Sequence, residues 1–373
     1  MRKILLIAVL ALALIAVPLF AGCAPVKEET TPAETTPAET IELTYSNFFP
    51  PTHANAILGQ SWCDEITERT NGQVEFTYYP GGSLTAGPEV YDGVVEGISD
   101  VGMTVLAYTA GRFPLTQVVD LPLKYPSGWV ATQAASDFYN EFTPEEFSDT
   151  HPLYFHAHGP GVLFTVEKPV RKLEEIQGMQ IRGTSMGAKV VKALGAEAYA
   201  AGQGEAYELM SKKVVDGSYT PREVLKGWNQ AEVVKYVTDC REVGYTANMI
   251  VTMNNDKWAS LPQDVKDVFT EVSEEWVPKH GKVWSGYDKM GIDYFKSLGE
   301  GREVIDLSAD ETARWVDAVN PLIDNYIDET SAEGLPGQEA VDYVEERIGY
   351  YSDQAPTADE CLTYLEEVLA QAE

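Results

Sequence analysis

Cysteine, histidine and basic residues are scarce in this sequence. Its 373 residues include 4 cysteines and 5 histidines, and 27 Lys and Arg stand against 58 Asp and Glu, which gives a formal net charge of -31. Four cysteines in so long a chain exclude a disulfide-stapled scaffold. The shortage of basic residues argues against a nucleic-acid partner, because phosphate binding needs a positive surface. Apolar and aromatic residues are plentiful, at 44% and 10%, so the chain is globular and long enough for two lobes.

The first 22 residues resemble a secretory signal peptide. Two basic residues precede an apolar run over 4–17, and small residues follow it. Because this run is near the lower length limit for a spanning helix, an uncleaved membrane anchor is the alternative. The tripeptide ending at Cys23 resembles a bacterial lipoprotein box, in which the cysteine is lipidated and becomes the new N-terminus. We therefore expect a signal peptide over 1–22 and lipidation at Cys23.

A low-complexity tether follows over 23–40. It is rich in Pro, Thr and Glu and has no aromatic residue, so it cannot bury enough apolar surface to fold. Anchor and tether predict that the folded part, over 41–373, lies in the periplasm or another extracytoplasmic space, attached to the membrane by lipid. Three cysteines remain there, and their odd number leaves at least one free thiol: Cys63, Cys240 and Cys361. Their pairing stays open, and their spacing indicates no metal site.

Strand and helix patterns alternate through most of the folded part. Apolar residues at every second position predict strands near 41–45 and 74–78, each followed by a helix with one apolar side, and another strand begins near 100. A second alternation begins near 163, with a strand that ends at Arg182. It continues with helices over 188–194, 205–212 and 224–236, a short edge at 214–217 and a strand over 247–252.

From 264 onward the pattern is mostly helical. The alternation predicts an α/β fold of two lobes, with mixed or parallel sheets flanked by helices, a ligand cleft between the lobes and a helical C-terminal region.

Residues 183–187 read GTSMG and match the G-x-S-x-G elbow that carries the nucleophile of serine hydrolases. Ser185 would be the nucleophile, the loop beginning at His158 would form an oxyanion hole, and His280 would be the base. Two features weigh against this hydrolase. The charged Arg182 ends the strand beside the supposed nucleophile, and the loop lies too close in sequence for the intervening strands of that fold. A glycine-rich turn that caps a helix is the plainer interpretation.

His156 and His158 lie on one side of a predicted strand. Metal binding would need further ligands, which five histidines in the whole chain supply poorly, so we expect packed or hydrogen-bonded histidines and no metal.

Arg182 is the residue that points to a function. It lies where a strand meets the N-terminus of the next helix, where free N–H groups and the helix dipole already favour an anion. A guanidinium there can hold a carboxylate by two parallel hydrogen bonds. A surface salt bridge with one of the many acidic residues is the alternative.

Segments spread in order over 41 to about 330 resemble the DctP-type solute-binding receptors of TRAP transporters. They read TNG over 70–72, YPGGSL over 79–84, VVEGISDV over 94–101, GRFPL over 111–115, DLPL over 120–123, IQGMQIR over 176–182, KALGA over 192–196, EAY over 205–207, VVDG over 214–217 and DKWASLP over 256–262. Such an ordered series is far more specific than the lone G-x-S-x-G motif.

The resemblance implies a two-lobed receptor that closes on one organic acid, passes it to a membrane permease, uses no cofactor and catalyses no reaction. It implies that the first lobe spans about 41–162 plus about 253–373, and the second about 163–252. Arg182 matches the arginine that binds the substrate carboxylate in this family. The other expected cleft residues, by family position, are Asn47, Phe48, Gln203, Thr220 and Tyr245.

Two departures from the family pattern bear on the ligand. A second arginine that many members carry is absent from GPGVL over 159–163, and the DGQENP of many members reads DGSYTP over 216–221. Losing a cation and an amide favours a monocarboxylate, with an aromatic or apolar tail, because a second carboxylate would be buried unpaired. Arg222 could supply another cation, or be a solvated helix residue. A secreted serine hydrolase using Ser185 and a surface lipoprotein without a closing cleft remain the alternatives.

Overall fold

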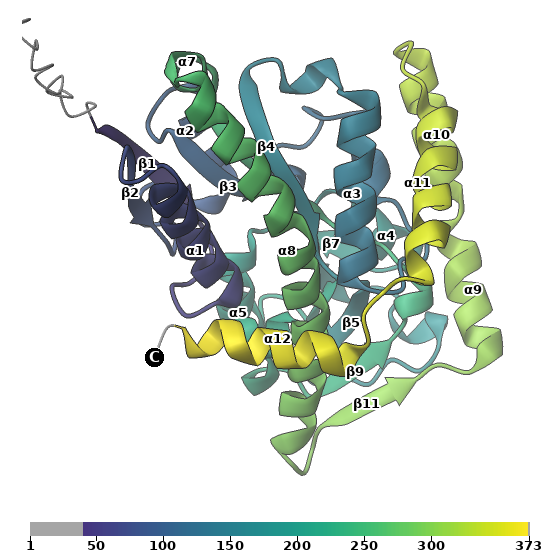
Figure 1. Cartoon of the computed structure of the whole chain (residues 1–373). Coiled ribbons are helices and arrows are strands. Elements are labelled where there is room, and N and C mark those ends of the chain that lie inside the picture. Colours follow the sequence, from purple (N-terminus) through teal and green to yellow (C-terminus); the bar gives the residue numbers. More distant parts are fainter. Residues whose placement is uncertain (1–39, 372–373) are drawn as a thin grey trace, which may run out of the picture. The chain divides into compact units, whose positions relative to one another are not determined.

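Two mixed β-sheets organise residues 40–371, which a computed structural model of the chain describes (Figure 1). The first sheet has the strand order β2-β1-β3-β10-β4, and we call the part built on it the first lobe. Strands β1, β2 and β3 run parallel, and β10 is antiparallel to both of its neighbours. Its strands are β1 (Ile41–Asn47), β2 (Val74–Tyr79), β3 (Val101–Val105), β4 (Thr150–Ala157) and β10 (Asn248–Asn254). The expected signal peptide, the lipidated Cys23 and nearly all of the tether lie outside the described residues.

The second sheet has the order β11-β9-β5-β8-β6-β7 and forms the core of the second lobe. β5 is antiparallel to β8 and β9, whereas β6 pairs in parallel with β7 and β8. Its strands are β5 (Gly161–Thr165), β6 (Gln180–Arg182), β7 (Glu197–Tyr199), β8 (Gly217–Pro221), β9 (Tyr236–Asp239) and β11 (Glu303–Asp306). Every residue of β5 and β8 is buried, as central strands require.

Helices pack on both sheets. In the first lobe α1 packs on β2 and α3 on β4, and in the second lobe α4 packs on β7 and α5 on β8. The α-helices of the described residues are α1 (Ala54–Arg69), α2 (Val90–Val95), α3 (Gly128–Phe142), α4 (Ser185–Ala193), α5 (Gln203–Ser211), α6 (Val224–Gly227), α7 (Asn255–Ser260), α8 (Gln263–Ser297), α9 (Ala309–Val319), α10 (Pro321–Ala332), α11 (Gly337–Ser352) and α12 (Ala358–Ala370). This arrangement confirms the predicted fold class.

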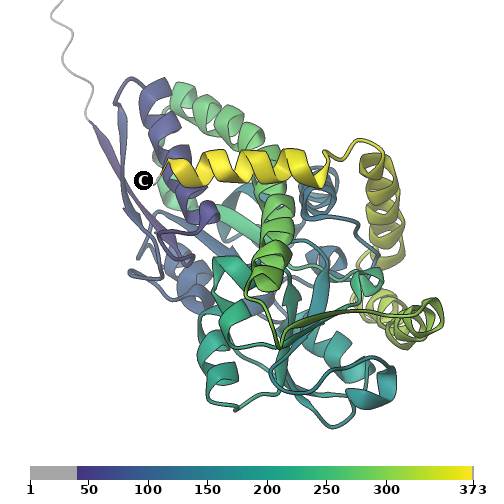
Figure 2. The same ribbon diagram turned by 90° about the horizontal axis from the view of Figure 1, so that it is seen from below.

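The long helix α8 packs on both lobes. It contacts α1, α3 and β4 in the first lobe and α6 in the second. Phe269, Trp276 and Trp284 recur on its buried side at helical spacing. The C-terminal α12 lies across α8 (Figure 2), where a Cβ on Gly286 would come within 2.4 Å of the Cys361 carbonyl oxygen. The crossing therefore depends on a glycine in the middle of α8.

The chain passes between the two sheets at points that differ from the predicted lobe boundaries. β5 begins at Gly161 and already belongs to the second sheet, whereas β10 belongs to the first sheet although 163–252 was assigned to the second lobe. β11 returns to the second sheet from within 253–373, which was assigned to the first lobe. Short strands that pair with partners far away in sequence leave no local signal of the sheet that they join.

The predicted helix over 224–236 is wrong beyond Gly227. Asn229 adopts φ 55°, a left-handed conformation that stops a helix, and β9 begins at Tyr236. The predicted short edge at 214–217 is also displaced, because the strand begins only at Gly217 and lies inside the sheet.

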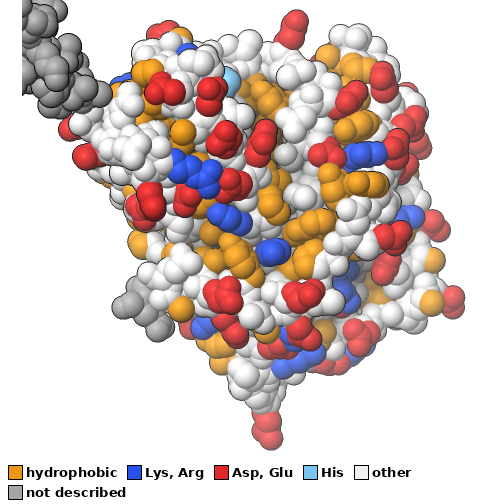
Figure 3. All heavy atoms as spheres, in the orientation of Figure 1, with side chains coloured by type: hydrophobic (Ala, Val, Ile, Leu, Met, Phe, Trp, Pro, Cys, Tyr) orange, Lys and Arg blue, Asp and Glu red, His pale blue; other side chains and the backbone are white. Residues whose placement is uncertain are grey.

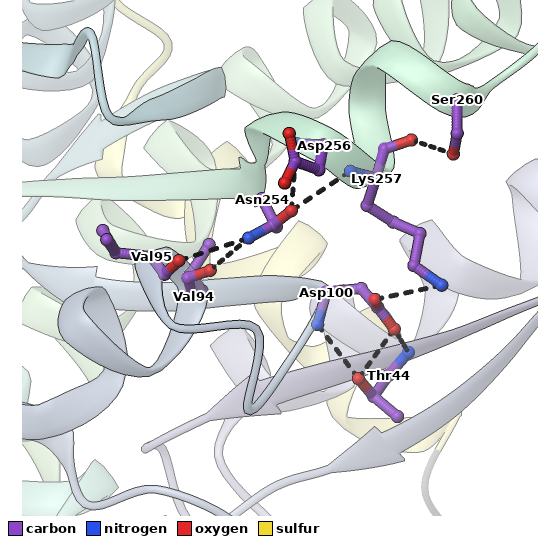
Figure 4. A network of polar contacts seen from close by, with 8 residues as sticks. All are labelled: Thr44, Val94, Val95, Asp100, Asn254, Asp256, Lys257 and Ser260. Carbon is purple, nitrogen blue, oxygen red and sulfur yellow. Dashed lines mark hydrogen bonds and ion pairs between the residues drawn. The ribbon is translucent and has the colours of Figure 1, made fainter.

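A polar network joins β1, β3, β10 and α7 at one end of the first sheet (Figure 4). Asp100 accepts hydrogen bonds from the backbone N–H of Thr44 at 2.7 Å and from its hydroxyl at 2.9 Å, and it pairs with Lys257 at 3.3 Å. Asn254 caps α7 through its Oδ1, while its amide nitrogen donates to the carbonyl of Val94. These contacts fix the antiparallel β10 against the parallel strands.

Acidic side chains are spread over the face of the molecule shown in Figure 3 and do not form one patch there. Cys63, Cys240 and Cys361 are buried free thiols, so within residues 40–371 the open question of pairing resolves to no disulfide. None of the helices in that range combines the length and the apolar character needed to cross a bilayer.

Candidate ligand-binding site

An aromatic cavity lies between the two lobes. About 420 Å³ of space, which includes the opening to solvent, lies between its walls. The first lobe, the second lobe and α8 all contribute to its lining, which consists of Phe48, Phe49, Val105, Tyr108, His158, Arg182, Thr184, Gln203, Thr220, Pro221, Glu223, Val224, Trp228, Tyr245, Ala247, Met249 and Trp284. Five of the six predicted cleft residues are among them; Asn47 is not.

Arg182 ends β6 at the wall of the cavity and is 3% exposed. Its Nε donates to the carbonyl oxygen of Ala201 at 3.0 Å, and one terminal nitrogen donates to Oε1 of Gln203 at 3.0 Å. Both acceptors are neutral, and within residues 40–371 no carboxylate forms an ion pair with this guanidinium. The surface salt bridge considered as the alternative is therefore absent from the described residues, and the cavity holds a buried cation that can pair with an anion.

Gln203 connects Arg182 to the opposite lobe. It is the first residue of α5, and its backbone N–H donates to the hydroxyl of Tyr108 in the first lobe at 3.1 Å. Its side-chain Nε2 is buried and has no hydrogen-bond partner among residues 40–371. Since Oε1 already accepts from Arg182, this nitrogen is a further donor beside the guanidinium.

Aromatic side chains make up much of the remaining lining. The ring of Phe48 stacks on Phe49 with 4.4 Å between centroids, and it lies 5.8 Å from Tyr108 and 6.2 Å from Trp228. Tyr245 packs against Gly161, where a Cβ would lie 2.1 Å from its ring. Such a wall favours a flat or apolar ligand body.

Besides Arg182 and two tyrosines, the titratable groups that line the cavity are His158 and Glu223. Burial lowers the pKa of His158 to about 4, and the nearby Arg182 charge acts in the same direction, so this imidazole is neutral. Burial raises the pKa of the Glu223 carboxyl well above its usual value. Arg182 is therefore the only Lys or Arg among the lining residues, and Glu223 is the only acid.

Asn47 and Arg222 lie outside the cavity lining. Asn47 is fully buried at the end of β1, where its Oδ1 accepts the backbone N–H of Phe49 at 2.9 Å. It shapes the turn that carries Phe48 and Phe49, as asparagine often does. Burial raises the pKa of Asp288 to about 6, and the charge of Arg222 offsets part of that rise. Arg222 is not among the lining residues and supplies no second cation to the cavity.

The hydrolase alternative has no support in the geometry. The Ser185 hydroxyl accepts a hydrogen bond from the Gln117 side chain at 3.1 Å and lies outside the cavity lining. His280, the supposed base, instead contacts Asn55 at 3.0 Å and Tyr154 at 3.3 Å. Nucleophile and base therefore belong to separate hydrogen-bonded groups.

The two histidines considered for a metal site also have other partners. His156 accepts a hydrogen bond from the indole nitrogen of Trp284 at 3.0 Å and stacks on His280. Residues 40–371 contain no cluster of His, Cys, Asp and Glu that could hold a metal ion.

Several lining residues were not predicted from the sequence, among them Tyr108, Glu223, Trp228 and Trp284. Tyr108 ends a three-residue 3-10 helix, Trp228 directly follows α6, and Trp284 lies within α8. The one available signal for Glu223 was its position two residues after Pro221, directly behind a predicted cleft segment.

The sequence matches one known family over most of its length. Residues 46–330 match the family model of the bacterial extracellular solute-binding proteins, family 7 (DctP). Among curated proteins, the C4-dicarboxylate-binding periplasmic protein DctP of Rhodobacter capsulatus is 24% identical over 295 residues, which are 76% of this chain and 85% of that protein.

Solved structures share both the fold and part of the sequence. A TRAP periplasmic solute-binding protein from Desulfovibrio salexigens is 31% identical with a TM-score of 0.74, over 85% of this chain and 98% of that one. A TRAP periplasmic solute-binding protein from Bordetella bronchiseptica, with bound (R)- and (S)-mandelate, is 28% identical with a TM-score of 0.78, over 83% and 99%.

Proposed function

The chain belongs to the bacterial extracellular solute-binding proteins of family 7, the DctP-type receptors of TRAP transporters, and we propose that it binds one small monocarboxylate with an aromatic or apolar body. The observation that carries the proposal is the buried Arg182, which has only neutral hydrogen-bond partners and faces an aromatic cavity. A carboxylate of the ligand would complete the pairing by two parallel hydrogen bonds. The unpaired amide nitrogen of Gln203 would add a third donor.

The balance of charge in the cavity favours one carboxylate over two. Arg182, the one cation in the lining, can neutralise one carboxylate. The only Asp or Glu in the lining is Glu223, which cannot neutralise a second one. A second carboxylate would be buried without a partner and beside another carboxyl group, which costs several kcal/mol or more.

The aromatic wall supports the proposed ligand body. Phe48, Trp228 and Tyr245 offer flat apolar surfaces, against which an aromatic ring or a branched alkyl group loses contact with water. The Bordetella relative holds mandelate, an aromatic monocarboxylate, which agrees in kind with this proposal.

Capture by closure follows from a cavity whose walls belong to two lobes. A ligand that touches both lobes binds only the closed arrangement tightly, so it shifts the equilibrium toward closure. We infer that the closed receptor hands its cargo unchanged to a membrane permease and catalyses no reaction.

Lipid attachment completes the proposal. We propose that Cys23 is lipidated after removal of 1–22 and that the tether over 23–40 holds the receptor at the outer side of the cytoplasmic membrane. Mass spectrometry of the mature protein tests this, since an intact N-terminus or an unmodified Cys23 contradicts it.

A thermal-shift screen of residues 41–373 tests the ligand class. Aromatic and branched monocarboxylates should raise the melting temperature by mass action, whereas their methyl esters, which lack the charge, should not. A set of dicarboxylates of similar size serves as the comparison. Equal shifts from acids and esters, or shifts from dicarboxylates alone, would contradict the proposed monocarboxylate site.

A further inference from the structure

Glu223 is a buried carboxyl group in the cavity wall, and the family resemblance assigns it no role. It is 2% exposed and follows β8 at the start of the short turn that leads into α6. Its backbone N–H donates to Asp288 on α8 at 3.1 Å, and its carbonyl accepts the N–H of Gly227 at 2.9 Å. These contacts hold the residue in place, so its side chain meets the cavity in a defined position.

One carboxyl oxygen of Glu223 is occupied by His53 from the first lobe. Glu223 Oε1 lies 2.7 Å from His53 Nε2, and His53 Nδ1 lies 3.2 Å from the backbone nitrogen of Asn55. A backbone amide can only donate, so Nδ1 carries the lone pair and the ring proton is on Nε2. His53 therefore donates a hydrogen bond to Glu223 and remains a neutral imidazole, in agreement with a pKa that burial lowers to about 3.

The charge of Glu223 has no compensation in the described residues. Its only ion-pair contact within residues 40–371 is the one to His53, which the hydrogen bonding makes neutral. Two basic residues close in sequence are directed elsewhere: Lys226 lies over the ring of Tyr294, and the charge of Arg222 acts on Asp288. Burial keeps the pKa of the Glu223 carboxyl high, and the neighbouring Trp228 indole offsets part of that rise.

The second oxygen, Oε2, is the one left for a ligand. The contact with His53 leaves no room for another group, since a Cβ on Gly227 would lie 2.6 Å from His53 Nε2 and 2.8 Å from Glu223 Oε1. The other polar neighbour of the carboxyl group is the Trp228 side chain, which acts on it as a hydrogen-bond donor, and Glu223 lines the cavity. As an acid it can donate a hydrogen bond, and as a carboxylate it can accept one.

We propose that Glu223, held by His53, is a specificity residue that hydrogen-bonds a hydroxyl group of the bound acid. The natural ligand is then a hydroxy monocarboxylate, with its carboxylate on Arg182 and its hydroxyl group on Glu223. A hydroxyl group suits this position because it can both donate and accept. This inference rests on the proposed function and adds a second recognition point to it.

Other polar groups fit the position less well. A second carboxylate would meet an acid with no cation beside it. An ammonium group would need Glu223 to be ionised. It would also be attracted by the faces of the surrounding aromatic rings, so one amino compound is among the probes below.

Calorimetric titration with matched acids tests the inference. The probes are benzoate with 3- and 4-hydroxybenzoate, phenylacetate with mandelate and 3- and 4-hydroxyphenylacetate, and 3-(aminomethyl)benzoate. In the wild-type receptor, at least one hydroxy acid should bind about tenfold or more tightly than its parent acid, because a site built for a polar group rejects an analogue that lacks it.

Two variants separate hydroxyl recognition from its alternatives. Glu223→Gln keeps an oxygen for His53 and a polar group for the ligand, so it should retain most of the preference. Glu223→Leu should reduce the preference, measured as the ratio of the two affinities in the same variant, to less than about twofold. A cooperative unfolding transition of this variant shows separately that it is folded.

The opposing outcomes are distinct. A hydroxyl preference that persists in Glu223→Leu, or a panel without any hydroxyl preference, overturns the role of Glu223. So does a preference for the amino compound that is lost in Glu223→Gln, because it identifies an ammonium site. If the parent acids do not bind at all, or bind equally well to Arg182→Ala, the proposed receptor function itself fails.

Discussion

A guanidinium withdrawn from water costs free energy unless an anion pairs with it. Arg182 is in that state, because its hydrogen bonds to Ala201 and Gln203 compensate its polarity without compensating its charge. A carboxylate that enters the cavity gains a cation that the protein has already desolvated. If the ligand binds as proposed, the binding free energy is therefore concentrated on this residue, at the expense of the stability of the empty receptor.

Replacing Arg182 by alanine should separate affinity from stability. We expect Arg182→Ala to weaken binding of the ligand acid by about 100-fold or more, because a buried charge-assisted pair is lost. The unliganded variant should unfold at the same temperature or a higher one, since an unpaired buried cation is removed. Arg171→Ala is the control, because Arg171 is half exposed and pairs with Glu303 on the surface of the same lobe. Unchanged ligand affinity in Arg182→Ala would overturn its assignment.

Asp120 is a buried acid whose ionisation should lower the stability of the fold as the pH rises. Burial raises the pKa of its carboxyl from 3.8 to about 7, and the N–H of Asn248, which donates to it at 2.7 Å, opposes this only in part. A raised pKa in the folded state means that the stability is complete below about pH 4 and is lost as the pH rises toward 7.

Asp120→Asn should remove this loss of stability at high pH, while the side-chain oxygen still accepts the hydrogen bond from the backbone N–H of Asn248. Relative to wild type, the free energy of unfolding of the variant should rise by about 2 to 3 kcal/mol between pH 5 and pH 8. Denaturant titrations at the two pH values measure this difference. A stability difference that does not vary with pH would show that Asp120 does not titrate in this window.

At the scale of elements, α8 holds the two lobes and α12 together. It packs on helices of both lobes, and its contact with α12 is close because Gly286 presents no side chain to the Cys361 carbonyl. Glycine is normally unfavourable inside a helix by about 1 kcal/mol relative to alanine. At Gly286 the close crossing outweighs that cost.

Gly286→Ala should therefore destabilise the protein in spite of its better helix propensity. The added Cβ would lie 2.4 Å from a backbone oxygen, so α12 must shift, at a cost of about 1 to 3 kcal/mol. Gly349→Ala in α11 is the matched control: a Cβ there meets nothing within 4 Å, and the exchange should stabilise by about 0.5 to 1 kcal/mol. Chemical denaturation measures the free energy of unfolding of both variants. A change of the same sign in both would refute this account of α8.

At the scale of the whole molecule, contacts across the cavity join the two lobes. The Tyr108 hydroxyl accepts the first N–H of α5, His53 bonds to Glu223, and Gln117 donates to Ser185. Contacts of this kind exist only when the lobes are together, so in the proposed closing mechanism they would set how long the receptor keeps its ligand.

Tyr108→Phe should shorten that time. Without the hydroxyl the N–H of Gln203 loses its partner in the closed form alone, and ligand release should become about 2- to 10-fold faster with little change in overall stability. Stopped-flow fluorescence can follow release, because Trp228 and Trp284 line the cavity. Tyr350→Phe, on an exposed tyrosine, should leave the rate unchanged. A release rate unaffected by Tyr108→Phe would show that this contact does not hold the lobes together.

The fold class and the position of Arg182 were accessible from the sequence because both depend on local patterns. Strand and helix periodicity survives in any one segment, and the ordered family segments place Arg182, Gln203, Thr220 and Tyr245 by position. The helix predicted over 224–236 failed because one left-handed residue, Asn229, ended it. Asn47 was predicted to line the cleft but is not among the lining residues, although its neighbour Phe48 is. The side chain of Asn47 instead accepts a hydrogen bond from the backbone of Phe49.

The sequence by itself determined the α/β alternation and a strand that ends at Arg182, since hydrophobic periodicity and turn residues act over a few positions. The receptor family followed from the ordered segments that resemble it. Only the tertiary structure decided which lobe β10 and β11 join, and that Arg182 has neutral partners. It alone brought His53 against Glu223, 170 positions further along the chain. Pairing and charge compensation depend on groups distant in sequence, and no local pattern records which of them will meet.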